Sequence, residues 1–320
     1  MDILQIKNLN LGFVGENGFN QALFNVNFTL KQGEMHALVG ESGCGKSITA
    51  MSILKLLPKN SQITSGEIIF DNKDLIKLSP KEFVHIRGEK IALIPQDPMT
   101  SLNPLFTIGD QLLEVLSIHQ GIKGKEAEKK AIEALDIVRI PSAKSRLKSY
   151  PHEFSGGMKQ RAIIAMALCC EAEILIADEP TTALDVTIQA QIMNLLNTIK
   201  KEKNTSIILI THDLGVVYEN ADRISVMYAG RIVEEASSQD FFKNTNHPYS
   251  KALLNSIPSS DKSKLLTIAG QPPTIMQNIP GCRFNPRCNF AMDICKSKIP
   301  ELSEISPCHF SACFLNNNLY

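Results

Sequence analysis

The sequence predicts an α/β fold, and three stretches indicate it. The first is an apolar run, MHALVG, followed by the glycine loop GESGCGKS and by the helix-like stretch KSITAMSILKLL. The second and third are EILIADEP and TSIILI, short apolar runs of the kind that form buried strands. Strand, glycine loop and helix in succession are the context in which a phosphate-binding loop occurs.

The composition is ordinary for a globular chain of one large domain and a smaller one. Of the 320 residues, 43% are hydrophobic and 21% are charged, with 33 Lys and Arg against 33 Asp and Glu. A net charge of zero gives no general attraction to nucleic acid or anionic lipid. No run approaches about eighteen uncharged apolar residues, and the N-terminus lacks a secretory pattern. We therefore expect a cytosolic chain without a membrane span.

The glycine loop fits the phosphate-loop pattern G-x-x-x-x-G-K-[ST]. A chance match in a chain of this length has odds on the order of a per cent. Glycines let successive backbone N–H groups point at phosphates, and the helix N-terminus adds partial positive charge. Lys46 would reach the β- and γ-phosphates, and the Ser47 hydroxyl would ligate Mg²⁺. The predicted nucleotide-binding residues are Gly40, Glu41, Ser42, Gly43, Cys44, Gly45, Lys46, Ser47 and Ile48.

Two acids end the predicted strand EILIADEP. Asp178 fits the position that holds Mg²⁺ in a P-loop enzyme, and Glu179 is placed to polarise or deprotonate an attacking water. The alternative for an isolated acidic pair is a solvated turn. The phosphate loop elsewhere in the chain favours the catalytic interpretation.

A second glycine loop, Ser155-Gly156-Gly157 in FSGGMKQR, opens a predicted helix. It offers another anion-binding helix N-terminus. Since one ATP does not need two such loops from one chain, we expect two subunits to form a dimer. Each subunit's second loop would then close over the ATP of its partner.

In order along the chain, these motifs resemble those of the ATP-binding subunit of an ABC transporter. The phosphate loop, SGGMKQR as signature, ILIADEP as Walker B and ALD at Ala183 to Asp185 follow the family's order. Gln96 in LIPQDP and His212 in ILITHD also match. The resemblance covers about residues 3–260 and implies a P-loop core of ABC type with an antiparallel β subdomain and a helical subdomain.

The resemblance also implies roles for single residues. Ser155 and Gly157, with Gly156 between them, would contact ATP on the opposite subunit, and Asp185 would lie at the dimer seam. Gln96 would sense Mg²⁺ and the lytic water, and His212 would hold the γ-phosphate. Taken alone, Gln96 could be a solvated loop amide and His212 a strand-end residue. Phe13 is a candidate to stack on adenine, with plain core as the alternative. Met158, where many members have Gln, recurs in the peptide-importer branch.

We expect residues 1–260 to form the nucleotide-binding domain and residues 261–320 to form a C-terminal cysteine-rich extension. Residues 97–154 contain IGDQLLEVLSIH and KEAEKKAIEALDIV, whose apolar residues recur with helical period. We assign them to the helical subdomain, with Gln96 at its hinge. Its groove would receive a short helix from a membrane partner.

Five of the eight cysteines follow residue 281, with the spacing C-x5-C-x6-C-x12-C-x4-C. This spacing differs from that of zinc ribbons and common ferredoxins, and it leaves a metal site and buried free thiols both open. HPYSKALL and GCRFNPRCNFAMDIC resemble the C-terminal extension of oligopeptide and dipeptide importer ATPases, some of which carry a 4Fe–4S cluster. By motif position its ligands would be Cys282, Cys288, Cys295 and Cys313. Cys308 is extra, His309 is a possible substitute ligand, and zinc is the alternative metal.

Together, the motifs predict the ATP-hydrolysing subunit of an importer for peptides or related small solutes. The implied partners are a second ATPase subunit, typically in a heterodimer, two transmembrane permeases and, indirectly, an extracytoplasmic binding protein. We expect no nucleic-acid partner and a peripheral place at the cytoplasmic face of the inner membrane. One rival is a soluble ABC ATPase of DNA repair or translation, which would carry tandem domains, a coiled-coil insertion or basic arms. A regulatory subunit that binds ATP without turnover is the other.

Overall fold

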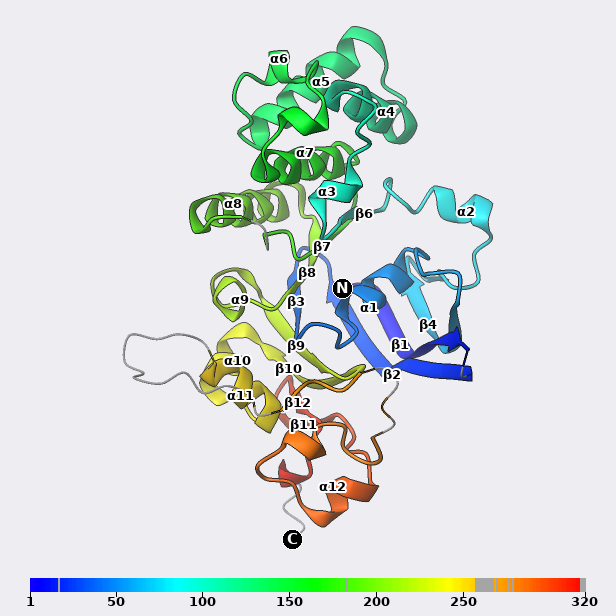
Figure 1. Cartoon of the computed structure of the whole chain (residues 1–320), viewed down its shortest axis with the longest axis vertical. Helices are drawn as coiled ribbons and strands as arrows, with labels where there is room; N and C mark the ends of the chain where they lie inside the picture. The colour runs from blue at the N-terminus through cyan, green and yellow to red at the C-terminus, as the bar shows by residue number, and fades with distance from the viewer. Residues whose placement is uncertain are drawn as a thin grey trace. The chain divides into compact units, whose positions relative to one another are not determined.

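The structure is a computed structural model that describes residues 1–16, 18–181, 184–256, 268, 270–274, 277 and 279–316 (Figure 1). The chain forms two compact units. The first unit comprises Met1–Lys77 and Ile210–Tyr320, and the second comprises Leu78–Leu209. No helix in these described ranges is long and apolar enough to cross a bilayer.

The first unit contains an antiparallel sheet in the order β2-β1-β4-β5, as the motif resemblance implied. β1 and β2 form a long hairpin in which Leu4 pairs with Leu30. Alternate apolar side chains of both strands, such as Leu4 and Val26, are buried on one face of the sheet. The strands are β1 (Asp2–Gly15), β2 (Gly18–Lys31), β4 (Ser61–Phe70) and β5 (Lys73–Asp74).

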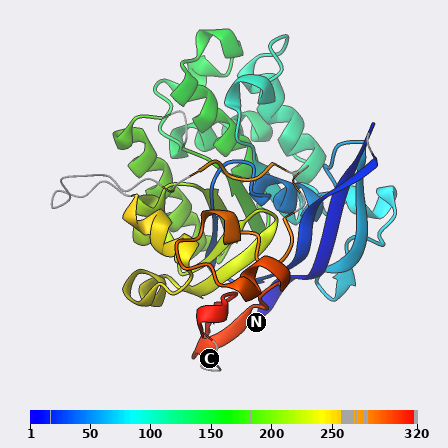
Figure 2. The ribbon, with the colours of Figure 1, turned by 60° about the horizontal axis from the view of Figure 1, so that its bottom comes forward.

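The first unit also carries strands in the order β11-β12-β10-β9-β3. All of β3 is buried, and it pairs in parallel with β9, as expected for the strand that leads into a phosphate loop. The short strand β12 adds to the edge of β10 and brings the C-terminal segment against it (Figure 2). The strands are β3 (Met35–Val39), β9 (Arg223–Tyr228), β10 (Arg231–Ser237), β11 (Ser303–Ser306) and β12 (His309–Ser311).

The helices of the first unit follow its strands and loops. Helix α1 ends at Ile53, although the apolar spacing predicted helix as far as Leu57. It stops early because Lys55 takes a left-handed backbone, with φ of 49°. The helices are α1 (Lys46–Ile53), α9 (Leu214–Asn220), α10 (Ser238–Asn244), α11 (Pro248–Asn255), α12 (Asp293–Ser297) and the short 3₁₀ turns η2 (Asn285–Arg287) and η3 (Phe314–Asn316).

In the second unit, strands lie in the order β8-β7-β6. β6 and β7 are parallel, and every residue of β7 is buried. Near-continuous apolar runs of this kind are typical of parallel strands covered on both faces. The strands are β6 (Ile91–Ile94), β7 (Ile174–Asp178) and β8 (Ser206–Thr211), whose last two residues belong to the first unit.

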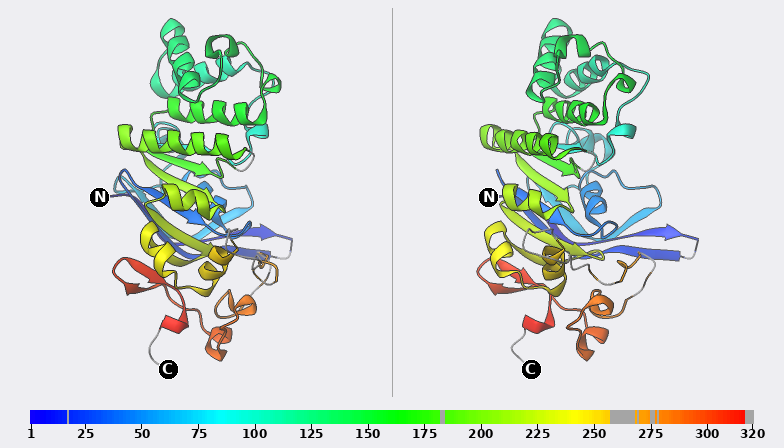
Figure 3. Two further views of the ribbon diagram at one scale, coloured as in Figure 1. Left: turned by 90° about the vertical axis from the view of Figure 1, so that its left-hand side faces the viewer. Right: turned by 60° about the vertical axis from the view of Figure 1, so that its left-hand side comes forward.

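Helices α4, α5 and α7 of the second unit pack against one another (Figure 3). The predicted helical period is confirmed, since Ala127, Ala131 and Leu135 of α5 are all buried. A capping box between Thr107 and Asp110 starts α4. The helices are α2 (Pro80–Val84), α3 (Pro98–Ser101), α4 (Ile108–Gln120), α5 (Gly124–Ile137), α6 (Ala143–Arg146), η1 (Pro151–Glu153), α7 (Gly156–Cys169) and α8 (Val186–Lys203).

Candidate nucleotide site

The predicted phosphate loop lies between β3 and α1 in the first unit. Lys46 is 5% exposed, and its Nζ donates hydrogen bonds to the carbonyl oxygens of Gly40 (2.7 Å) and Glu41 (3.0 Å). These two bonds curl the loop around the ammonium group. Ser42 and Gly43 are exposed at the turn of the loop, and Cys44 is buried beneath them. Burial raises the pKa of the Cys44 thiol, which keeps it neutral beside the lysine.

Two glycines of this loop are required by its geometry. A Cβ on Gly40 would lie 2.2 Å from the carbonyl oxygen of Met227, so only glycine fits there. Gly45 has φ of 114° and caps α1 without a side-chain hydrogen bond. The first backbone N–H groups of α1 therefore face the loop without a capping side chain, as a phosphate-binding helix N-terminus requires. Ser47 and Ile48 belong to this first turn.

The predicted acidic pair lies at the end of β7 in the second unit. Asp178 is 4% exposed and Glu179 is 9% exposed. Gln96, just after β6, donates a hydrogen bond from Nε2 to Oε2 of Glu179 over 3.1 Å. Two adjacent parallel strands thus bring Gln96 and Glu179 together, 83 residues apart in the sequence. Glu179 has φ of 47°, in the left-handed region that residues other than glycine rarely adopt.

The second glycine loop begins α7. Ser155 is the N-cap of this helix, and its hydroxyl accepts the backbone N–H of Met158 over 3.3 Å. Gly156 and Gly157 form the first turn, and a Cβ on Gly156 would meet no atom within 4 Å. The absence of side chains there leaves the amide groups of the helix N-terminus open to an anion.

The remaining predicted site residues are exposed or half-buried. They are Asp185, Phe13 and His212. Asp185 is exposed and caps α8 by accepting the backbone N–H of Ile188 over 2.9 Å. Ala183, the start of the predicted ALD motif, lies outside the described residues. Phe13 is half-buried on β1, and His212 is exposed directly after β8. Phe13 and His212 belong to the unit of the phosphate loop, whereas Gln96, Glu179 and the second glycine loop belong to the other unit.

Four of the tail cysteines share one small cavity in the first unit. Cys282, Cys288, Cys295 and Cys313 line it together with Phe284. Burial raises the pKa of the Cys282 thiol to about 11, and the other three thiols add to that increase. Cys308 is exposed and does not line the cavity.

The four thiols, all among the described residues, are not arranged as metal ligands as they stand. In the ranges that the structure describes, no group of three or more His, Cys, Asp or Glu side chains could hold a metal ion as they stand. His309, the suggested substitute ligand, is engaged elsewhere. Its Nδ1 bonds the Asp240 carboxylate (2.6 Å) and its Nε2 bonds that of Glu234 (2.8 Å).

Comparison with known proteins places these motifs in a family. Residues 23–182 match the family described as "ABC transporter", and residues 233–295 match "Oligopeptide/dipeptide transporter, C-terminal region". The "Probable peptide ABC transporter ATP-binding protein y4tR" of Sinorhizobium fredii is 51% identical over 99% of this chain and 96% of its own length. The "Oligopeptide transport ATP-binding protein OppD" of Salmonella typhimurium is 49% identical over 98% and 93%.

A solved structure is also similar. The dimeric ATP-binding cassette MJ0796, in a post-hydrolysis state bound to ADP and Pi, superposes with a TM-score of 0.67. It is 31% identical and covers 73% of this chain and 98% of its own. This chain belongs to the ABC transporter ATP-binding proteins. The predicted ABC cassette fold is confirmed, and the chain is an ABC-type ATPase.

One contact of this ABC ATPase's phosphate loop was missed by the sequence reasoning. Tyr249, buried in α11, accepts the backbone N–H of Glu41 on its hydroxyl oxygen over 2.9 Å. The motif HPYSKALL contains this tyrosine, but its role could not be seen from the motif. Nothing in the local pattern shows that a residue 208 positions away contacts the loop.

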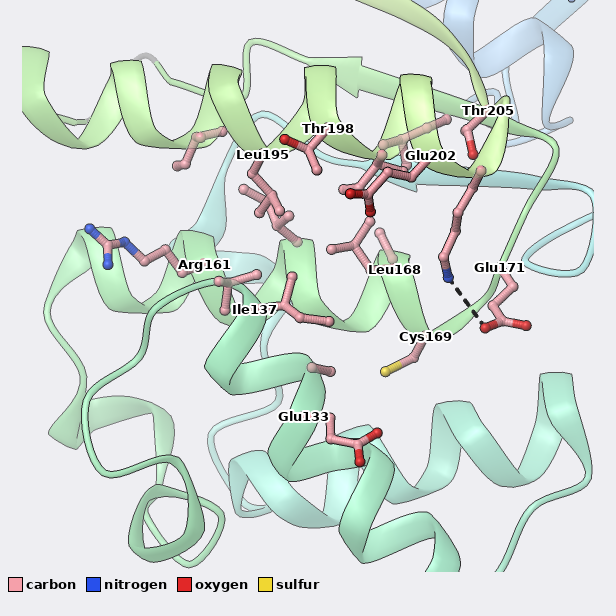
Figure 4. A pocket seen from close by; sticks show the side chains of 18 of the residues that line it. Glu133, Ile137, Arg161, Leu168, Cys169, Glu171, Leu195, Thr198, Glu202 and Thr205 are labelled. Carbon is pink, nitrogen blue, oxygen red and sulfur yellow. Dashed lines mark hydrogen bonds and ion pairs between the residues drawn. The ribbon is translucent and has the colours of Figure 1, made fainter. Parts of the chain in front are cut away.

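The second unit of the ABC ATPase also contains a cavity of about 670 Å³ between α5, α7 and α8 (Figure 4). Ile137, Leu168 and Leu195 provide apolar lining. Glu171 and Lys203 form an ion pair of 3.3 Å at one end. None of the described residues predicted for the nucleotide site lines this cavity.

Proposed function

We propose that this ABC ATPase is the ATP-hydrolysing subunit of a membrane importer for peptides or related small solutes. The observation that carries the proposal is the pairing of an ABC transporter match with an oligopeptide/dipeptide transporter C-terminal match in one chain. Relatives named for peptide transport support it over nearly the full length. ATP binding and hydrolysis would drive subunit closure because ATP binds the closed form better than the open one.

The phosphate loop binds the triphosphate in this proposal. The amide groups at the start of α1 donate to phosphate oxygens, and Lys46 moves its ammonium from the loop carbonyls to the β- and γ-phosphates. Ser47, Asp178 and Gln96 would hold Mg²⁺, which when bound would supply positive charge to neutralise the triphosphate. Phe13 stacks on adenine.

Hydrolysis in this proposal depends on Glu179. Its carboxylate takes a proton from the attacking water as the water oxygen bonds to the γ-phosphorus and the bond to the bridging β,γ-oxygen breaks. Gln96 orients Glu179 through the 3.1 Å hydrogen bond, and His212 steadies the γ-phosphate. Catalysis is mainly positioning and charge stabilisation, as in other phosphoryl transfers.

The assembly completes the site. Ser155, Gly156, Gly157 and Asp185 act on ATP bound to a second ATPase subunit, in a heterodimer. The dimer works at the cytoplasmic face of the inner membrane with two permeases and, indirectly, an extracytoplasmic binding protein. Residues 1–260 form the nucleotide-binding domain, residues 97–154 its helical subdomain and residues 261–320 the cysteine-rich extension.

The experiment for this function is ATP turnover by the subunit co-expressed with its neighbouring permease and ATPase genes. Glu179→Gln removes the general base but keeps a side chain of the same shape. We expect turnover to fall by about 10²-fold or more, because general-base catalysis is worth that much. Glu173→Gln, an exposed acid at the other end of β7, is the matched control and leaves turnover unchanged. Equal turnover in wild type and Glu179→Gln would assign the chemistry to the partner subunit.

For the tail we propose a 4Fe–4S cluster on Cys282, Cys288, Cys295 and Cys313. The shared cavity of these thiols, the exposure of Cys308 and the carboxylate partners of His309 support this ligand set over the alternatives. Ligation would require the four thiols to rearrange from their present positions. The cluster would hold the fold of the tail and would not transfer electrons.

Iron and sulfide content after anaerobic purification test the cluster. We expect about four irons and visible absorbance, both lost in Cys313→Ser and both kept in Cys308→Ser. Stoichiometric zinc in place of iron would show that the tail holds a zinc site and no iron–sulfur cluster. Protein without either metal would leave buried thiols as the correct assignment.

A further inference from the structure

We propose that Arg287, in the C-terminal region, is a positioning residue for the phosphate loop and sets how tightly this subunit binds ATP. The proposal deepens the function above and rests on the phosphate loop being the ATP site. It assigns to the C-terminal region a direct effect on the nucleotide.

The contact is a two-pronged ion pair within the first unit. Arg287 Nη1 lies 2.6 Å from Oε2 of Glu41, and Nη2 lies 3.0 Å from Oε1. The two residues are 246 positions apart in the sequence. The Arg287 side chain is 6% exposed and that of Glu41 is 23% exposed. A paired guanidinium and carboxylate with this geometry and burial are screened little by salt.

Glu41 is therefore held at both its backbone and its side chain. Its N–H donates to the hydroxyl of Tyr249 (2.9 Å), while Arg287 also donates to the hydroxyl of Tyr228 (3.4 Å). Phe284, three residues before Arg287, packs against both tyrosine rings with centroid separations of 5.1 and 5.4 Å. This aromatic packing fixes the short turn η2 that presents Arg287.

The held residue is also the one on which the phosphate lysine rests. The Glu41 carbonyl accepts Nζ of Lys46 (3.0 Å) and the backbone N–H of Cys44 (3.3 Å). A shift of Glu41 would thus move both the lysine and the loop amides that bind phosphate. Holding these groups in place before ATP arrives lowers the ordering cost of binding.

Charge adds a second effect. Glu41 places a carboxylate within the loop that must accept a highly anionic triphosphate, and like charges repel. Arg287 neutralises that carboxylate by direct pairing. Without Arg287, the unpaired acid would oppose ATP at the same place where the loop has lost its support.

The chain also links this contact to the cysteines. Arg287 directly precedes Cys288, which lines the cysteine cavity. The folding of that cavity and the position of Arg287 are therefore connected by a single peptide unit. A change in the tail would reach the phosphate loop by this route.

The test measures the dissociation constant of a fluorescent ATP analogue with Mg²⁺, and KM and kcat of the co-expressed complex. In Arg287→Ala we expect the dissociation constant and KM to rise about tenfold, as for loss of a charge-assisted hydrogen bond, while kcat at saturating ATP stays within about twofold. Arg287→Lys keeps the charge but loses the two-pronged guanidinium contact. We expect its dissociation constant to lie between those of wild type and Arg287→Ala. Removing the unpaired acid as well, in Arg287→Ala with Glu41→Gln, restores about half of the lost affinity on a logarithmic scale.

Arg283→Ala is the matched control. Arg283 lies in the same segment, with its guanidinium 4.1 Å from the Phe24 ring centroid, and does not touch the loop. We expect its ATP affinity to equal that of wild type, with both alanine variants showing a cooperative thermal melt.

Unchanged affinity in Arg287→Ala, an equal loss in Arg283→Ala, or no recovery in the double variant would each overturn the proposal. If Arg287→Ala does not fold, the ATP affinities of Arg287→Lys and Arg283→Lys are compared. Weaker binding in Arg287→Lys alone supports the proposal, and equal binding overturns it. Because analogue binding needs neither hydrolysis nor transport, the proposed import function and this inference fail independently.

Discussion

At the scale of single residues, His247 shows how burial controls protonation. Its Nδ1 accepts the backbone N–H of Tyr249 over 3.1 Å and so caps α11. An acceptor nitrogen cannot carry a proton, so this cap requires neutral imidazole. Burial lowers the pKa of His247 to about 3. The same residue begins the HPYSKALL motif, and nothing in that motif indicates this constraint.

The first prediction at this scale concerns acid stability. Between about pH 6.5 and pH 3, His247 in the unfolded chain binds a proton that the folded chain does not bind, so lowering the pH favours unfolding. We expect His247 to contribute a loss of roughly 1 kcal/mol per pH unit in that window. Urea unfolding of wild type and His247→Asn from pH 7.5 to pH 4.5 measures the difference.

Asparagine can cap α11 but does not titrate, so the stability gap between His247→Asn and wild type should change in favour of the variant as the pH falls. A gap that stays constant across the range would mean that His247 does not titrate with a lowered pKa. The comparison is needed because carboxylates titrate over the lower part of the same window.

At the scale of elements, β12 joins the C-terminal segment to the sheet of the first unit. Two of its residues pair with β10, which is little backbone bonding for an element that fixes a tail. The His309 side chain strengthens the attachment of β12, because its ring forms hydrogen bonds with both Glu234 and Asp240. Glu234 is fully buried and also accepts the backbone N–H groups of Asn246 and His247. The pKa of Asp240 is lowered mainly by Asn244 and also by His309.

We expect His309→Ala to destabilise the docking of β12. It leaves the buried Glu234 carboxylate without its ring partner, and a hydrogen bond to a charged group is typically worth about 1.5–3 kcal/mol. Limited proteolysis should cleave the tail much faster in this variant, with a lower midpoint in urea. Cys308→Ser, at the exposed neighbouring position, is the control and should match wild type. Equal proteolysis of His309→Ala and wild type would show that strand pairing alone anchors β12.

At the scale of the whole molecule, the nucleotide motifs divide between the two units. The phosphate loop and His212 belong to one unit, and Gln96, the acidic pair and the second glycine loop belong to the other. The C-terminal region belongs to the unit of the phosphate loop, which allows Arg287 to reach Glu41.

The sequence by itself determined the local motifs of this protein. The phosphate loop, the acidic pair at the end of β7 and the glycines in the first turn of α7 could be predicted because each depends on residues that are neighbours in the chain. Periodicity likewise predicted the buried face of α5. Apolar spacing alone predicts an α1 that extends too far, because it does not reveal the left-handed backbone at Lys55.

Only the tertiary structure decided which distant side chains meet. The pair Arg287–Glu41, the engagement of His309 by Glu234, and the cavity shared by four cysteines but not by Cys308 all join residues far apart in the sequence. No local pattern encodes such contacts, since they depend on where each strand and turn is placed in three dimensions. Burial then gives these pairs their strength, and burial is a property of the folded chain.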